Sequence, residues 1–125
     1  MPELSPEDIH RRFADAFNAH DLDALVALYE HHAVLVPGAG SRAVGRDAIR
    51  TALAGFLAGF QTIEISNRGT VQHGDIALLY PEFHLHGTGP DGKPTTLDGQ
   101  GTEVVRRHHP YDGWLYVIDD PFSTA

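Results

Sequence analysis

Residues 76–86 read IALLYPEFHLH, a run of aliphatic and aromatic residues that favours a β-strand. Alternate side chains of a strand point to opposite faces of its sheet. One face of this strand would therefore carry Ala77, Leu79, Pro81, Phe83 and Leu85. The opposite face would carry Leu78, Tyr80, Glu82, His84 and His86. We expect the first set to face the core, because all of its members are apolar.

The residues on both sides of this stretch extend the strand pattern. The glycine-rich segment 87–93 predicts a turn, and residues 95–107 are expected to run back as the partner strand. A second turn at residues 110–113 leads to a last strand at residues 114–119. Upstream, apolar and polar residues alternate from Thr62 onward, which predicts a further strand before residue 74.

The first part of the chain shows helical spacing instead. Ser5 and Pro6 are residue types that favour a helix start, with Ser5 as the N-cap. Ile9, Phe13 and Phe17 follow at every fourth position and form one apolar face. We therefore expect a first helix that begins near Ser5 and buries its two phenylalanines.

Two further helices and one short strand are expected before residue 62. An apolar stripe over residues 22–29 predicts a second helix, which is capped at His20-Asp21. Residues 33–36 predict a strand, and the Pro37-Gly38 pair ends it. Helical spacing from Gly45 to Phe60 predicts the third helix. Helices first and strands afterwards indicate a single α+β domain over residues 1–125, with three N-terminal helices packed on a curved antiparallel sheet.

The composition narrows the possible partners and the location. Seventeen acidic residues against nine Lys and Arg give a net charge of −8, which repels nucleic acid and anionic membranes. The chain has no cysteine, so neither disulfides nor thiolate metal sites are available. The N-terminal residues lack a signal-peptide pattern, and no apolar run approaches about 18 residues. We expect a cytoplasmic protein that binds neither nucleic acid nor membrane.

Three segments resemble recurring signatures of the SnoaL-like branch of the nuclear-transport-factor-two-like superfamily. They are residues 18–29 (NAHDLDALVALY), 44–49 (VGRDAI) and 112–114 (DGW). The similarity is closest to a bacterial branch that includes a protein of enediyne biosynthesis. The resemblance implies a cone-shaped, cystatin-like fold, a pocket between the helices and the sheet, and a homodimer.

The resemblance does not imply one reaction, because related proteins include ketosteroid isomerases, polyketide cyclases, epoxide hydrolases and proteins without known catalysis. Ketosteroid isomerases carry a tyrosine where this chain has Phe13, and a general-base aspartate at or beside Pro37. The chain therefore does not resemble a ketosteroid isomerase in its catalytic residues. Polyketide cyclases carry an acid–base aspartate on the last strand, which matches Asp119. Asp120 remains an alternative, because a shift of one residue reverses the face of a strand.

A second carboxylate, Glu103, stands on a central predicted strand beside two valines. An unpaired carboxylate in that position would be costly, so it needs a partner. We expect an ion pair with Arg106, Arg107 or His84, and a role for Glu103 as a general base is the alternative.

The predicted pocket is mostly aromatic. Tyrosine combines an apolar ring with a hydroxyl group and can therefore both line a pocket and orient a ligand oxygen. Its expected lining residues are Phe13, Phe17, Tyr29, Phe56, Phe60, Phe83, Glu103 and Tyr116.

Glu82, His84 and His86 share one strand face, which is a spacing that metal sites use. This face lies opposite the helices in our interpretation, so we expect Tyr80, His84 and His86 to form a dimer contact. No metal and no cofactor are expected.

Two classes of function remain open from the sequence. The first is a cofactor-free enzyme for a hydrophobic polyketide-, steroid- or terpenoid-like molecule. It would use proton transfer by Asp119 or Asp120 in isomerase, cyclase or hydratase-type chemistry. The second is a non-catalytic, dimeric ligand-binding or accessory module. A carboxylate buried in a cavity would favour the first class, and one bound by backbone N–H groups would favour the second.

Overall fold

Three helices precede most of the strands in the computed structural model, which describes residues 5–108 and 113–123. The helices are α1 (Asp8–Asn18), α2 (Leu22–Val26) and α3 (Arg46–Gly59). The strands are β1 (Tyr29–Leu35), β2 (Ala43–Val44), β3 (Thr62–His73), β4 (Ile76–Thr88), β5 (Pro94–Gln100), β6 (Thr102–His108) and β7 (Gly113–Asp120). This order confirms the predicted α+β class. The predicted turn at residues 110–113 lies almost wholly outside the described residues.

The start of α1 differs from the prediction, whereas the start of α2 agrees with it. The N–H of Ser5 donates to Oδ2 of Asp8 over 2.9 Å, but the N-cap position belongs to Glu7, whose side chain makes no capping bond. The regular helix nevertheless starts only at Asp8, because the residues before it form a turn. The N–H of Ala24 donates to Oδ1 of Asp21 over 3.1 Å, and this bond caps α2 as the sequence predicts.

The second helix is shorter than predicted. It ends at Val26, and Tyr29 begins strand β1 instead of continuing the helical stripe. Tyr29 lies opposite Tyr116 of β7, and their ring centroids are 4.9 Å apart. Pairing between distant strands therefore overrides the local helical spacing at this point.

Seven strands form one sheet in the order β2-β1-β7-β6-β4-β3, with β5 also paired to β4. The strand pairs are antiparallel, as predicted, with one correction: β1 and β7 pair in parallel. The expected partner strand of β4 is divided into β5 and β6 at Gly101. A Cβ atom on Gly101 would lie 2.7 Å from the carbonyl oxygen of Asp120, so glycine allows the C-terminal segment to cross there.

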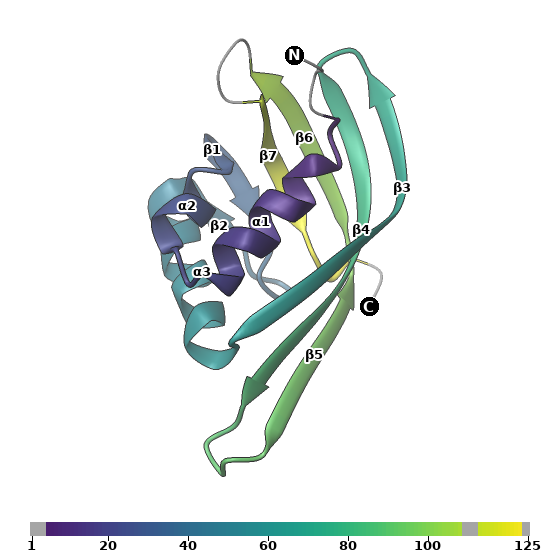
Figure 1. Cartoon of the computed structure of the whole chain (residues 1–125). Coiled ribbons are helices and arrows are strands. Elements are labelled where there is room, and N and C mark those ends of the chain that lie inside the picture. The colour runs from purple at the N-terminus through teal and green to yellow at the C-terminus, as the bar shows by residue number, and fades with distance from the viewer. Residues whose placement is uncertain (1–4, 109–112, 124–125) are drawn as a thin grey trace.

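The helices lie on one face of this curved, unclosed sheet (Figure 1). The apolar face of β4 points toward them, as the alternation predicts. Its buried residues are Ala77, Leu79, Pro81, Phe83 and Leu85. The opposite face of the sheet has no helix on it among the described residues (Figure 1). The core and any internal site therefore lie between the sheet and the helices α1 and α3.

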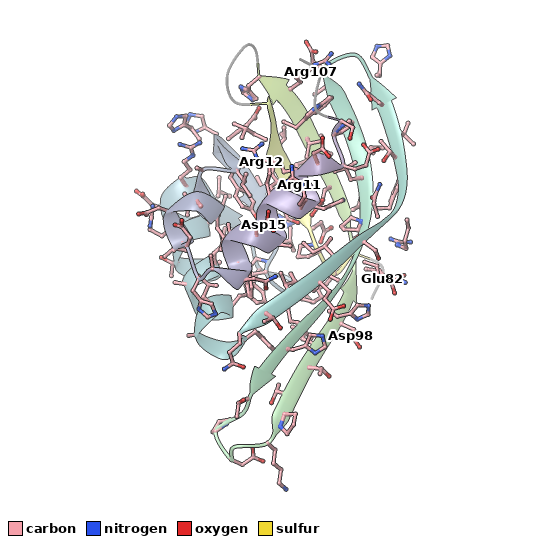
Figure 2. The ribbon with its side chains drawn as sticks, in the orientation of Figure 1. Arg11, Arg12, Asp15, Glu82, Asp98 and Arg107 are labelled. Carbon is pink, nitrogen blue, oxygen red and sulfur yellow. The ribbon has the colours of Figure 1, made fainter. Side chains whose placement is uncertain are left out.

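Most charged side chains lie on the outside of the molecule, and Glu103 and Asp119 are the buried exceptions among the described residues. Arg11 and Asp15 form an exposed ion pair along α1 (Figure 2).

None of the helices in the described part of the chain has the length and apolar character needed to cross a membrane.

Candidate functional site

A cavity of about 50 Å³ lies between the inner face of the sheet and helices α1 and α3. Its wall is almost entirely apolar. It contains these residues of the predicted lining: Phe13, Phe17, Tyr29, Phe56, Phe83, Glu103 and Tyr116. Phe60 is not part of the wall, because it lies at the end of α3, where it packs near Gly87. Asp119 is part of the wall, whereas Asp120 is not.

Two carboxyl groups lie next to each other in this apolar wall. Asp119 of β7 pairs with Glu103 of β6, so the two side chains are neighbours on the inner face. Glu103 pairs on its other side with Leu79, and Asp119 with Leu35. Glu103 and Asp119 are each only 5% exposed. The two acids therefore lie side by side in a cross-strand row and have a leucine on either side.

A β-bulge in β7 explains why Asp119 faces inward. Tyr116 pairs with Val105 and Ile118 pairs with Val104, so β7 has one extra residue at Val117. Strict alternation from buried Tyr116 would have turned Asp120 inward. The extra residue reverses the alternation and places Asp119 in the cavity wall.

Tyr29 contacts the carboxylate of Asp119 directly. Its hydroxyl donates to Oδ2 of Asp119 over 2.6 Å, and this bond lies within the buried interior. Burial and the nearby Asp119 charge raise the pKa of Tyr29 well above its ordinary value. Burial and the Glu103 charge do the same for the pKa of Tyr116. Both phenols are therefore neutral hydrogen-bond donors.

The carboxyl groups of Glu103 and Asp119 lie close enough to affect each other's ionisation. Two neighbouring carboxyl groups in a buried site do not both ionise near neutral pH, because their like charges repel. Burial, followed by the charge of Asp119, raises the pKa of Glu103 well above its ordinary value. Burial also raises the pKa of Asp119, while the hydrogen bonds from Tyr29 and Glu103 oppose this rise. The hydrogen bond from Tyr29 stabilises an ionised Asp119 and so favours Glu103 as the protonated member of the pair.

The partners that the sequence suggested for Glu103 are all bound elsewhere. They form the pairs Arg106–Glu30, Arg107–Asp75 and His84–Asp98. No arginine or lysine of the described residues forms an ion pair with Glu103 or Asp119. The predicted structural ion pair at Glu103 is therefore wrong, and a carboxyl–carboxylate pair takes its place.

His10 is a site residue that the sequence analysis missed. It stands on the buried face of α1, one turn before Phe13, and is 6% exposed. Its Nδ1 lies 3.7 Å from Oε1 of Glu103. A polar residue within the apolar stripe of an amphipathic helix was the available signal, because such a residue is buried with the stripe.

The histidines of β4 lie outside the cavity. His84 contacts Asp98 over 2.6 Å, and His86 contacts Glu64 over 3.1 Å. Within residues 5–108 and 113–123, no three His, Cys, Asp or Glu side chains are grouped in a way that could hold a metal ion.

We predict a pH dependence of stability that originates from the buried pair. Burial raises both carboxyl pKa values above those of the unfolded chain, whose ordinary value for Glu is 4.5. The folded protein then binds more protons than the unfolded chain once the pH exceeds that ordinary value. The contribution of the pair to the free energy of unfolding is therefore complete in acid and is lost as the pH rises toward the folded pKa values.

Urea titrations of wild type and Glu103→Gln across this pH range measure the effect. The variant should lose less stability with rising pH, by about 1.4 kcal/mol for each unit by which folding raises the Glu103 pKa. Glu82→Gln, on the outer face of β4, is the matched control. Parallel stability curves for wild type and Glu103→Gln would show that Glu103 is ionised in the folded protein.

The model of the SnoaL-like domain family matches residues 10–113, which is most of the chain. This chain belongs to the SnoaL-like family. No curated protein sequence matches it. The family assignment confirms the resemblance of the three sequence segments to this superfamily.

Solved structures share the fold of this SnoaL-like chain. A proposed aromatic ring hydroxylase from Novosphingobium aromaticivorans is 24% identical, with a TM-score of 0.74, over 95% of this chain and 87% of the other. A ketosteroid isomerase-like protein from Erwinia carotovora atroseptica is 21% identical, with a TM-score of 0.76, over 90% and 88%. A nuclear transport factor 2-like protein from Salmonella enterica is 15% identical, with a TM-score of 0.72, over 96% and 93%. At these identities the likeness establishes the fold and not the reaction.

Proposed function

We propose that the chain binds a hydrophobic small molecule in the cavity and exchanges a proton with it, without a cofactor. The observation that carries this proposal is the buried carboxyl pair Glu103–Asp119 in an otherwise apolar wall. Neighbouring carboxyl groups in a dry environment separate into an acid and a base, because both cannot be ionised together. One of the pair can then donate a proton near neutral pH while the other accepts one.

Asp119, Glu103 and Tyr29 each have a separate role in the proposed proton transfer. Asp119 accepts a proton from a carbon beside a ligand carbonyl, and the electrons of that C–H bond move toward the carbonyl oxygen. Glu103 donates its proton to this oxygen, so that an enol forms and the total charge of the site is unchanged. In a ligand with a neighbouring C=C bond, Asp119 then returns its proton to the far carbon of the dienol while the enol O–H returns its proton to Glu103, which restores the carbonyl and completes an isomerisation. The Tyr29 hydroxyl holds the Asp119 carboxylate in position through its 2.6 Å hydrogen bond.

The volume of the cavity determines which ligand sizes should be tested first. A cavity of about 150 Å³ is needed to hold benzene, whereas this cavity measures about 50 Å³. A ring therefore enters only if the wall moves outward. Phe122, which packs on Phe83 with ring centroids 5.4 Å apart, belongs to the C-terminal part of that wall. Monocyclic ligands require the smallest movement, and polyketide-, steroid- or terpenoid-like ligands require a larger one.

The proposal is tested with cyclohexanone and β-tetralone as probes. Thermal shifts report binding, and nuclear magnetic resonance in D₂O reports deuterium uptake at the carbon beside the carbonyl. We expect at least one ketone to stabilise the protein and to exchange its protons faster than in buffer. Absence of both binding and exchange would contradict the proposal.

Binding without exchange would support the second class of function, a non-catalytic ligand-binding module. One observation favours this alternative: Tyr29 already occupies Oδ2 of Asp119 with a short hydrogen bond. A carboxylate held in this way is a weaker base than a free one.

We also propose that two copies of the chain associate through the outer face of the sheet. The strand registers place six apolar side chains in one continuous row across this face. The row consists of Val44, Val34, Ile118, Val104, Leu78 and Val71. Ile118, near the middle, is 42% exposed, although it is a large apolar residue. An uncovered apolar row of this length is typical of a contact surface.

This row differs from the contact that the sequence suggested. His84 and His86 lie on the half of β4 that pairs with β5, and each contacts an acidic side chain instead of an apolar neighbour. The centre of the proposed dimer contact therefore moves from these histidines to Ile118.

We predict that Ile118→Lys converts a dimer into a monomer. A two-fold contact brings both copies of the same residue together, so that the substitution would place like charges in a desolvated region. Sedimentation of wild type and variant at micromolar concentration measures the effect. Ala48→Lys, on the exposed side of α3, is the control and should leave the assembly unchanged. A monomeric wild type, or an Ile118→Lys dimer, would contradict the proposed contact.

A further inference from the structure

His10 lies beside the carboxyl pair but has no part in the chemistry proposed above. Its Nδ1 and Oε1 of Glu103 are 3.7 Å apart. Both atoms are fully buried, and neither has a hydrogen-bond partner among the described residues. Only a small movement of either side chain would bring these two buried polar atoms within hydrogen-bond distance. The state of the imidazole therefore affects Glu103 directly.

Asn67 fixes which imidazole nitrogen carries the hydrogen. Nε2 of His10 lies 3.4 Å from Oδ1 of Asn67. The same Oδ1 accepts the N–H of Tyr80 over 3.3 Å, while Nδ2 of Asn67 donates to Thr70 over 2.8 Å. Because these two bonds orient the amide with its oxygen toward His10, Nε2 must be the donor. Nδ1 then carries no hydrogen, and its lone pair points toward Glu103.

The charge of His10 follows from its surroundings. Burial lowers the pKa of His10, while the hydrogen bond to Asn67 and the charge of Glu7 act in the opposite direction. Glu7 lies in the turn before α1, and Glu103 faces the ring from β6. The imidazole is therefore neutral near neutral pH, and its lone pair at Nδ1 is available as an acceptor.

We propose that His10 is a positioning residue that assigns the shared proton to Glu103 and thereby leaves Asp119 as the base. A lone pair at Nδ1 attracts the O–H of protonated Glu103 and repels an ionised Glu103 carboxylate. Protonation of His10 at Nδ1 would reverse this preference, because an N–H would then face Glu103. The role of His10 in proton exchange rests on the proposed function. Its effect on the location of the proton is a property of the ligand-free protein.

The Asn67→Asp variant tests this inference. A carboxylate at this position still accepts the Nε2 hydrogen and also stabilises the imidazolium. The His10 titration should therefore move upward by about 1–3 pH units. With His10 charged, Glu103 should lose its proton near neutral pH. Carbon-13 and nitrogen-15 chemical shifts, measured without ligand, report the carboxyl groups and the imidazole separately.

The wild type supplies an independent measurement should Asn67→Asp fail to fold. Its nitrogen-15 shifts should show the hydrogen on Nε2 of His10 near neutral pH. A hydrogen on Nδ1 would overturn the inference, as would an Asn67→Asp variant in which His10 is charged and Glu103 keeps its proton. Neither readout depends on ketone binding or exchange, so a failure of the proposed function is distinguishable from a failure of this inference.

Discussion

Replacing Asp119 with asparagine is expected to slow deuterium exchange of a bound ketone by about 10²–10⁴-fold, which is the range for the loss of a general base. Asparagine has nearly the same size, and its amide oxygen can still accept the 2.6 Å hydrogen bond from Tyr29. The fold should therefore persist, while the group that accepts the proton is lost. The measurement is the exchange rate in D₂O at saturating ketone.

Asp120→Asn is the matched control for this experiment. Asp120 is the next residue along β7 but does not line the cavity. Its variant should exchange the ketone at the rate of the wild type. Equal rates for wild type and Asp119→Asn, or a larger loss in Asp120→Asn, would show that Asp119 is not the base.

Replacing Phe17 with alanine is expected to lower the free energy of unfolding by about 3–5 kcal/mol. Phe17 is a buried core residue of α1 and lies in the cavity wall, with its ring centroid 6.2 Å from that of Phe13. Loss of the ring removes these packing contacts and enlarges the cavity. An enlarged apolar cavity should admit benzene, which at a hundred times its dissociation constant would restore about 2.7 kcal/mol.

Urea unfolding with and without benzene measures both effects. Phe60→Ala is the control, because Phe60 is a partly buried phenylalanine outside the cavity wall. It should lose less stability than Phe17→Ala and gain nothing from benzene. A Phe17→Ala variant that loses stability but is not stabilised by benzene would indicate a collapsed core instead of a cavity.

The spacing of apolar residues within a single strand or helix was sufficient to predict which of its faces is buried. The alternation in β4 identified its buried face, from Ala77 to Leu85, because side chains alternate between the two faces along a strand segment without a bulge. The same reasoning identified Phe13 and Phe17 as the buried residues of α1.

The features that the sequence did not predict depend on contacts between distant segments. The choice between Asp119 and Asp120 depends on the bulge at Val117, which the pairing with β6 creates. The parallel pairing of β1 with β7 depends on where the chain returns after the helices. The partner of Glu103 is another acid and a helix histidine, His10, and charge matching alone would not select either.

A carbon-13 titration of the carboxyl groups of Glu103 and Asp119 shows whether the two groups share one proton in the apolar cavity. We expect Glu103 to keep its proton near neutral pH, Asp119 to ionise at lower pH than Glu103, and Glu103→Gln to change the titration of Asp119. Two independent titrations near the ordinary carboxyl values of about 4 would contradict this expectation, because two ionised, non-interacting carboxylates could not supply both an acid and a base.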